Sequence, residues 1–188
     1  MNLSKKSVAA GGAIALIAGL SGLMIGQMQT PEYRLTMYEK NMTELGRADQ
    51  LFDLRYLNAM ITHHRGAVLL AEQAAKSQRA EIRDLAAAIQ TGEPKLIAEL
   101  YQWKKDWYGD TRTVRDPWVA ELGEVNDTFD LRFLNALIAH HEAGVLMTQE
   151  TRLKSSRAAV LDNADTVEAF LQTSGAELRE WRSAWYAQ

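Results

Sequence analysis

The four histidines of this 188-residue chain stand as two adjacent pairs. His63 and His64 follow the residues "MIT", and His140 and His141 follow "LIA" at an offset of 77 residues. Neutral imidazole binds zinc, copper, nickel and iron, so two doublets that meet in the fold could hold a metal ion. The structural alternative is a buried polar network, in which the imidazoles only join two parts of the core by hydrogen bonds.

Two methionines add sulfur to this pattern. Met60 stands three residues before His63 and four before His64, so it lies one helical turn from both. Met147 follows His140 by seven residues, about 10 Å along a helix, and could reach a shared ion only from across the fold. A thioether beside imidazole favours copper(I), or silver(I), over hard cations. The candidate metal ligands are therefore Met60, His63, His64, His140, His141 and Met147.

Other chemistries lack the residues that they need. The chain has no cysteine, which excludes disulfides, thiolate metal sites, iron–sulfur clusters and cysteine nucleophiles. A di-iron bundle needs Glu-x-x-His, but the residues three before the histidines are Met60, Ile61, Leu137 and Ile138. HExxH, P-loop, GxSxG and GxGxxG motifs are absent. The net charge of −3 provides no basic face. We therefore predict a protein that is not an enzyme and does not bind nucleic acid.

Both histidine pairs belong to a unit that occurs twice. Residues 52–70 and 129–147 are identical at 12 of 19 positions, and "ELYQWKKDWY" returns as "ELREWRSAWY" near the C-terminus. Apolar residues recur at three- and four-residue steps in both copies, which predicts helices. We expect the closing tryptophans to pack on the aromatic residues that open each unit: Trp103 and Trp107 near Phe52 and Tyr56, and Trp181 and Trp185 near Phe129 and Phe133.

Two helices joined by a short turn form a hairpin, and two hairpins form a four-helix bundle with a pseudo-twofold axis. The predicted fold class is therefore all-α, a four-helix bundle of two tandem hairpins. The predicted bundle spans residues 49–188 and contains repeat one (49–109), a polar linker (110–126) and repeat two (127–188). Gly92 and Pro94 predict a break or kink in the second helix.

The side chains of adjacent helical residues point about 100° apart, so the two histidines of a doublet face different directions. His64 and His141 continue the apolar stripes of their helices and are expected to face the bundle interior. His63 and His140 are then expected at its edge.

The N-terminal segment predicts a membrane helix. Lys5 and Lys6 precede 21 uncharged residues, Val8 to Met28, which as a helix can cross a hydrocarbon core of about 30 Å. A cleaved secretory signal is the alternative, but no strong Ala-x-Ala site precedes Gln29, so we predict an uncleaved signal anchor at 1–29. A connecting amphipathic helix is predicted at 30–48. The bulk of the chain is then expected in the periplasm or another extracytoplasmic compartment.

The segment "FDLRYLNAMITHHRGAVLLA" resembles the signature of the DUF305 family, roughly D-x-x-F-x-x-x-M-I-x-H-H-x-x-A-x-x-M-A, with a tryptophan closing the second helix. The matching positions are Asp53, Tyr56, Met60, His63, His64, Ala67 and Trp103, and in the second copy Asp130, Phe133, His140, His141, Met147 and Trp181. The resemblance covers about residues 50–188. It implies a ferritin-like four-helix bundle that is exported and often membrane-anchored, with copper(I) or silver bound by methionine and histidine in some members.

The chain departs from the family pattern in its methionines. The first copy keeps Met60 but has Leu70 at the later position, whereas the second has Leu137 at the earlier position and keeps Met147. If one composite site remains, the chain is a membrane-anchored extracytoplasmic copper-binding protein for buffering, delivery or tolerance. If binding has decayed, it is a non-enzymatic accessory or scaffold subunit of a larger membrane complex, with a structural histidine cluster.

Overall fold

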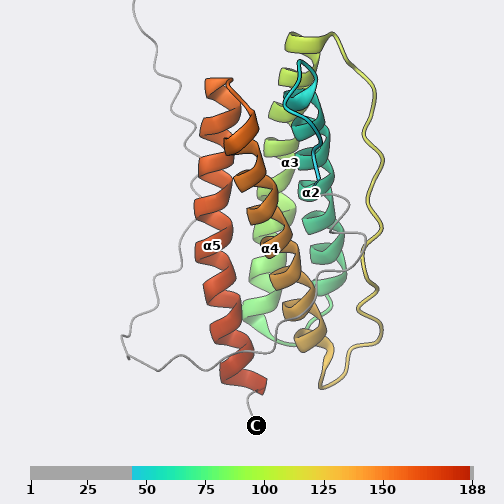
Figure 1. The fold of residues 1–188 in the computed structure, drawn as a ribbon. Coiled ribbons are helices and arrows are strands. Elements are labelled where there is room, and N and C mark those ends of the chain that lie inside the picture. The colour runs from blue at the N-terminus through green and yellow to red at the C-terminus, as the bar shows by residue number, and fades with distance from the viewer. Residues whose placement is uncertain (1–43, 187–188) are drawn as a thin grey trace, which may run out of the picture. The chain divides into compact units, whose positions relative to one another are not determined.

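The computed structural model describes residues 44–186, and this part of the chain contains four α-helices and no strand (Figure 1). The helices are α2 (Phe52–Ala74), α3 (Ala80–Tyr108), α4 (Phe129–Lys154) and α5 (Ala158–Tyr186). Helices α2 and α3 pack as one hairpin, α4 and α5 pack as the other, and α2 packs against α4 between them. The predicted all-α bundle of two tandem hairpins is confirmed.

The two helices that carry the histidines run in opposite directions. After α3 ends, the connection to α4 runs without helix along the whole bundle, so that α4 begins at the end where α2 finishes (Figure 1). An antiparallel arrangement of equivalent helices is what a pseudo-twofold axis perpendicular to them produces. Residues that precede a given position in α2 are therefore close to residues that follow the equivalent position in α4.

The predicted signal anchor at residues 1–29 lies outside the described residues, as does most of the predicted connecting helix at residues 30–48. The described end of that segment, residues 44–48, is not helical. Within residues 44–186, no helix is both long and apolar enough to cross a membrane.

The same loop precedes α2 and α4, a similarity that the sequence comparison did not use. Residues 44–46 and 121–123 both read Glu-Leu-Gly at the 77-residue offset. Gly46 and Gly123 have φ angles of 83° and 69°. This left-handed conformation is readily adopted by glycine alone, so each loop can turn sharply before its helix begins. The repeat therefore begins before Phe52, within the segment expected to be connecting sequence.

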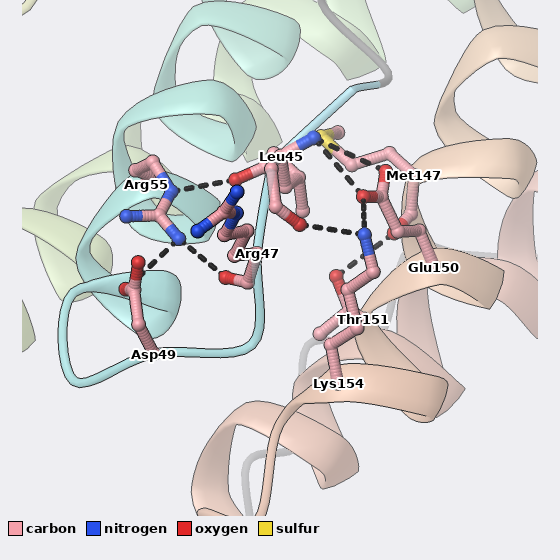
Figure 2. A network of polar contacts seen from close by, with 9 residues as sticks. Leu45, Arg47, Asp49, Arg55, Met147, Glu150, Thr151 and Lys154 are labelled. Atoms are coloured by element: carbon pink, nitrogen blue, oxygen red, sulfur yellow. Dashed lines mark hydrogen bonds and ion pairs between the residues drawn. The ribbon is translucent and has the colours of Figure 1, made fainter.

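Figure 2 shows how the first of these loops is held. Arg55 Nε donates a hydrogen bond to the Leu45 carbonyl at 2.5 Å, and the Leu45 amide donates to a Glu150 carboxylate oxygen at 3.1 Å. Lys154 Nζ donates to the Gly46 carbonyl at 2.6 Å and to Glu150 at 2.5 Å. The loop of the first repeat is thus attached to the last turns of α4, which belongs to the second repeat.

Each hairpin turn also contacts the helix start of the other repeat. Asp53 in α2 accepts hydrogen bonds from Ser155 Oγ at 2.7 Å and Arg157 Nε at 3.1 Å, both in the segment between α4 and α5. Asp130 in α4 accepts the matching bond from Ser77 Oγ at 2.6 Å. These exchanged contacts join the two hairpins at both ends of the bundle.

The apolar core consists of two clusters, one toward each end of the bundle. The first cluster contains Leu45, Phe52, Tyr56, Leu57, Met60, Ile61, Ile97, Leu100, Met147, Val160, Ala164, Val167 and Leu171. The second contains Leu70, Ala71, Ala74, Ile82, Ala86, Leu122, Phe129, Phe133, Leu134, Leu137, Ile138 and Leu178. In α2 and in α4, the histidine doublet lies in sequence between a residue of one cluster and a residue of the other. The histidines therefore form a polar layer between two apolar halves.

The paired tryptophans are partly buried and pack against the predicted core clusters. The rings of Trp103 and Trp107 stack with centroids 5.0 Å apart, and those of Trp181 and Trp185 stack at 5.3 Å. The first pair packs against the cluster that contains Phe52 and Tyr56, and the second against the cluster that contains Phe129 and Phe133. Each hairpin is thus closed by aromatic packing between its two ends.

Helix α3 is continuous through Pro94, so the predicted break near Gly92 and Pro94 is wrong, and the alternative of a kink stays a prediction. A proline inside a helix removes one backbone hydrogen bond and crowds the preceding turn, at a cost of about 3 kcal/mol. Pro94 itself is exposed. Ile82 and Ile97, on either side of it, are buried in the two core clusters. Tertiary packing on both sides of the proline therefore outweighs the local preference.

Candidate metal centre

The two histidine doublets meet where α2 packs against α4. The rings of His63 and His140 stack face to face, with centroids 3.9 Å apart and planes 5° apart. These residues are equivalent in the repeat, so the pseudo-twofold axis passes between their rings. The prediction that they lie at the edge of the bundle is wrong for His63, which is buried in the contact between the two helices, whereas His140 at the same contact stays partly exposed. His63 is only 4% exposed and His140 is half-buried.

Two glycines make room for the stacked rings. A β-carbon on Gly144 of α4 would lie 2.7 Å from His63 Cε1 and 2.5 Å from Leu171 Cδ1, so one of these side chains would have to move. A β-carbon on Gly66 of α2 would lie 3.2 Å from His140 Cε1. The sequence signal for this role is the reversed order of two small residues, Gly66-Ala67 in the first copy and Ala143-Gly144 in the second.

The other histidine of each doublet turns toward the second helix of its own hairpin. His64 Nδ1 shares a hydrogen bond with Glu93 Oε2 of α3. His141 Nε2 lies 3.2 Å from Ser174 Oγ of α5 and shares a hydrogen bond with it. His64 and His141 are 5% and 6% exposed, which confirms that both face the interior. Sequence analysis did not identify Glu93 or Ser174 as their partners, because these residues do not align with each other in the repeat.

Three buried imidazole nitrogens have no hydrogen-bond partner within residues 44–186. They are His64 Nε2, His140 Nε2 and His141 Nδ1. A buried polar atom without a partner destabilises a fold by about 1–3 kcal/mol. A cation bound to such a nitrogen would supply the missing partner, so each of the three atoms, taken singly, fits a metal ligand.

Burial keeps three of the histidines neutral. The loss of water around the ring lowers the pKa of His63 well below its usual value of 6.5, and the neighbouring histidines lower it further. Burial also lowers the pKa of His140 to about 3 and that of His141 to about 4. In His141 the nearby Leu137 carbonyl partly opposes this shift, although no hydrogen bond of normal geometry reaches Nδ1. Neutral imidazoles can bind a cation without first releasing a proton.

The two methionines lie on the same side of the histidine layer. Met60 and Met147 are both buried in the first core cluster, with 0% and 2% of their surface exposed. Met60 stands three residues before His63, and Met147 stands seven residues after His140. By helical rise, Met60 is therefore about 4.5 Å and Met147 about 10 Å from the axis between the two rings, in the same direction along the bundle. Leu137 and Leu70, which occupy the equivalent positions, lie together in the opposite cluster. The structure thus brings the sulfur atoms of Met60 and Met147 to the same side of the histidine layer.

The six predicted ligands do not converge on one point. Within residues 44–186, no group of three or more histidine and carboxylate side chains has the arrangement of a metal site. Because the rings of His63 and His140 are parallel and their centroids are 3.9 Å apart, their in-plane lone pairs lie in two separate planes and do not converge on a common ion. A site built from three or four histidines is therefore not formed in this arrangement.

The long connection between the hairpins covers the outer side of the helix crossing. Pro117 Cγ lies 3.5 Å from the β-position of Gly66, which also faces His140. The connection is attached to α2 by two parallel hydrogen bonds of 2.7 Å from Arg65 to Asp116. This segment, expected only as a linker, shields the stacked rings on this side.

The fold is similar to that of solved CopM structures. CopM in its Cu(I)-bound form matches with a TM-score of 0.63 and 22% sequence identity, over 72% of this chain and 98% of the CopM chain. The apo form matches with the same TM-score and shares at 24% identity, and the Cu(II)-bound form matches with a TM-score of 0.59 and 22% identity, over 71% and 97%. At this identity the likeness establishes a shared fold. None of the curated proteins compared with the chain matches it.

The sequence also matches the pattern of a family described as "Domain of unknown function (DUF305)". The match covers residues 21–79 and residues 53–121. Together these ranges span more than half of the chain, and both contain the first histidine doublet. The resemblance seen in the residues around His63 and His64 is therefore confirmed, and the chain belongs to the DUF305 family.

Proposed function

We propose that this chain is a non-enzymatic protein that binds one soft monovalent cation, copper(I) or silver(I), at the histidine layer. The observation that carries the proposal is the cluster of buried imidazoles with three nitrogens that have no partner within residues 44–186. Each unpaired nitrogen costs about 1–3 kcal/mol in the core, which a bound cation would offset. Several of the similar CopM structures contain Cu(I), Cu(II) or Ag, and this supports the choice of ion.

The positions of the sulfur atoms favour one composite site over two equivalent sites. Met60 lies one turn before His63 and His64, and Met147 approaches the same end of the layer from α4. The opposite end has leucine at both equivalent positions. A thioether next to an imidazole selects a soft ion. We therefore expect the ion between Met60 and the first doublet, with few ligands, and one ion per chain.

The role that fits such a site is to buffer or deliver copper, or to confer tolerance to it, outside the cytoplasm. This compartment follows from the predicted signal anchor at residues 1–29, with Lys5 and Lys6 on the cytoplasmic side. Fractionation of cells that express the full chain tests this assignment. We expect the protein in the membrane fraction, with residues 44–186 open to protease added outside the membrane. Recovery in the cytoplasmic fraction would contradict it.

Titration of the full-length chain with copper(I), against a competing chelator, tests the metal site. We expect one ion bound with a dissociation constant below about micromolar, and loss of this binding when His64→Ala and His141→Ala are combined. Thr62→Ala is the matched control, because Ala139 already occupies the equivalent position of the second repeat. Binding weaker than micromolar, or unchanged in the double variant, contradicts the proposal.

The second candidate function is a scaffold subunit of a membrane complex. It is favoured by the parallel stack of His63 and His140, which joins the two hairpins without a metal, and by the hydrogen bonds of His64 and His141, which join the two helices within each hairpin. Native sizing after gentle solubilisation tests it. Migration with a larger complex is expected under this function, and a free monomer at every detergent level counts against it.

A further inference from the structure

Glu93 is a buried carboxylate beside the histidine layer, and it has no counterpart in the second repeat. Only 8% of its surface is exposed, and its Oε2 is hydrogen-bonded to His64 Nδ1. Leu171 stands at the position that the 78-residue offset relates to Glu93. The other buried glutamate of the described core, Glu168, is paired with Arg152 at 2.8 Å. The two halves of the layer therefore differ by one buried carboxyl group.

The carboxylate decides which nitrogen of His64 is available. A carboxylate oxygen accepts a hydrogen bond, so a ring with a single N–H that bonds to it carries this hydrogen on Nδ1. The lone pair is then on Nε2, which is buried and has no partner within residues 44–186. A histidine held in this way by a carboxylate is the usual arrangement behind a metal ligand, because it fixes the tautomer and makes the free nitrogen more basic.

His141 is held less strictly than His64. Its Nε2 is bonded to the hydroxyl of Ser174, which can either donate or accept a hydrogen bond. Its Nδ1 lies near the Leu137 carbonyl but forms no regular hydrogen bond within the described residues. The contacts of His141 are therefore compatible with both neutral tautomers, whereas those of His64 select one.

We propose that Glu93 is a positioning residue that makes His64 the anchoring ligand, bound to the cation through Nε2, and that the charge of Glu93 balances a monovalent ion. The proposal rests on the proposed function and names the residue that sets the affinity of the site. A buried carboxylate and a monovalent cation are together neutral, whereas a divalent cation would leave a net charge in the core at a large desolvation cost. Met60, four residues before His64, lies on the same helix face and supplies the adjacent sulfur.

The tautomer of His64 is measured first, in the metal-free full chain labelled with ¹⁵N histidine. Long-range ¹H–¹⁵N correlation spectra distinguish a protonated ring nitrogen from one with a lone pair. We expect the hydrogen of His64 on Nδ1, and a mixture of tautomers when Glu93→Leu introduces the residue of the second repeat. Hydrogen on Nε2 in the wild-type protein overturns the proposal before any metal is added.

Silver(I), added as silver nitrate, then identifies the ligating nitrogen, because this ion is diamagnetic. We expect the ¹⁵N signal of His64 Nε2 to shift while Nδ1 remains protonated. Silver bound to other histidines with His64 Nε2 unchanged overturns this inference but leaves the proposed function intact. No shift in any histidine or methionine signal overturns the proposed function, and the inference falls with it.

The contribution of the charge is measured by copper(I) competition titration. Glu93→Gln retains an oxygen that can accept the Nδ1 hydrogen bond but removes the charge, and we expect affinity to fall about 10- to 100-fold. Ser174→Ala removes the matching hydrogen bond of His141 and is expected to change affinity by less than about threefold. Far-UV circular dichroism verifies that each variant is folded. Equal affinity of Glu93→Gln and wild type, or an equal loss in Ser174→Ala, overturns the proposal.

Discussion

The rings of His63 and His140 face each other across the pseudo-twofold axis with centroids 3.9 Å apart. Two residues separated by one repeat length thus become direct neighbours. Because α2 and α4 are antiparallel, the residue before the doublet in one copy lies near the residue after the doublet in the other. This relationship explains why Met60 and Met147, which look like remnants of two different half-sites, share one core cluster.

The close approach of the rings predicts that Gly144→Ala destabilises the bundle. The added methyl group would lie within 3 Å of both His63 and Leu171, and overpacking of this kind costs about 1–3 kcal/mol. Gly66→Ala is the matched control. Its methyl group would lie 3.2 Å from His140, a contact that a shift of a few tenths of an ångström relieves. The gain of about 0.5–1 kcal/mol from replacing a helical glycine by alanine opposes this cost, so we expect a smaller net effect than that of Gly144→Ala. Urea denaturation of the full chain measures both, and an equal effect of the two variants would contradict this account.

The exchanged contacts at the helix starts predict a second pair of stability effects. Removal of a partly buried aspartate that bonds the turn of the other repeat, by Asp53→Ala or Asp130→Ala, should cost about 1–3 kcal/mol in each case. Glu142→Ala, which breaks the exposed pair with Arg179, should change stability by less than about 1 kcal/mol. Denaturation midpoints with a common m-value decide between them. If all three variants behave alike, the contacts between repeats contribute no more than an ordinary surface pair.

The neutral histidines predict a loss of stability in acid. In the folded chain the pKa of His140 is about 3 and that of His141 about 4, and that of His63 is also well below 6.5. An unfolded chain binds protons on these residues near pH 6.5, whereas the folded chain does not. Unfolding is therefore favoured progressively as the pH falls from 6.5 toward 3, and it is unaffected by these groups above 6.5.

Thermal unfolding of the metal-free protein between pH 7.5 and pH 4 measures this dependence. His140→Phe keeps an aromatic ring against His63 but cannot bind a proton, so its melting temperature should fall less steeply with acid than that of the wild type. Parallel profiles for the two proteins would show that His140 does not contribute.

The position of the sulfur atoms predicts that a second metal site can be restored. Combining Leu70→Met with Leu137→Met places methionine at both equivalent positions in the opposite cluster. Exchange of leucine for methionine conserves volume and usually costs less than about 1.5 kcal/mol, so the fold should survive. Under the proposed function, copper(I) stoichiometry should rise from one to two ions per chain. Leu122→Met, which adds sulfur in the pre-helix loop, is the control, and a second ion bound there equally well would indicate nonspecific thioether binding.

The repeat pattern and helical periodicity were sufficient to predict much of the fold. The 77-residue offset, the apolar steps and the closing tryptophans correctly predicted two hairpins, their aromatic ends and the inward direction of His64 and His141. These features are local or repeated, so they can be read from spacing along the chain. The expected break at Pro94 failed because a local preference was outweighed by packing on both sides of it.

The candidate site was less predictable than the fold, because its geometry depends on contacts between segments that are far apart in the chain. Residue type and spacing suggested six metal ligands, and this set stays a prediction. That His63 is buried in a stack with His140, instead of lying at the edge, depends on the crossing of α2 with α4 and on the space left by Gly66 and Gly144. No spacing within one helix contains this information, because it arises from two distant segments approaching closely.

The sequence by itself determined the helices, the duplication and the pairing of histidine with methionine, because each follows from the order of residues within one repeat. Only the tertiary structure decided the partners. It placed Glu93 against His64 and Ser174 against His141, and it brought Met60 and Met147 to one side of the layer. The physical reason is that the pseudo-twofold axis relates two nearly identical segments in opposite directions. Small sequence differences between the copies therefore place different side chains at the two ends of one buried layer.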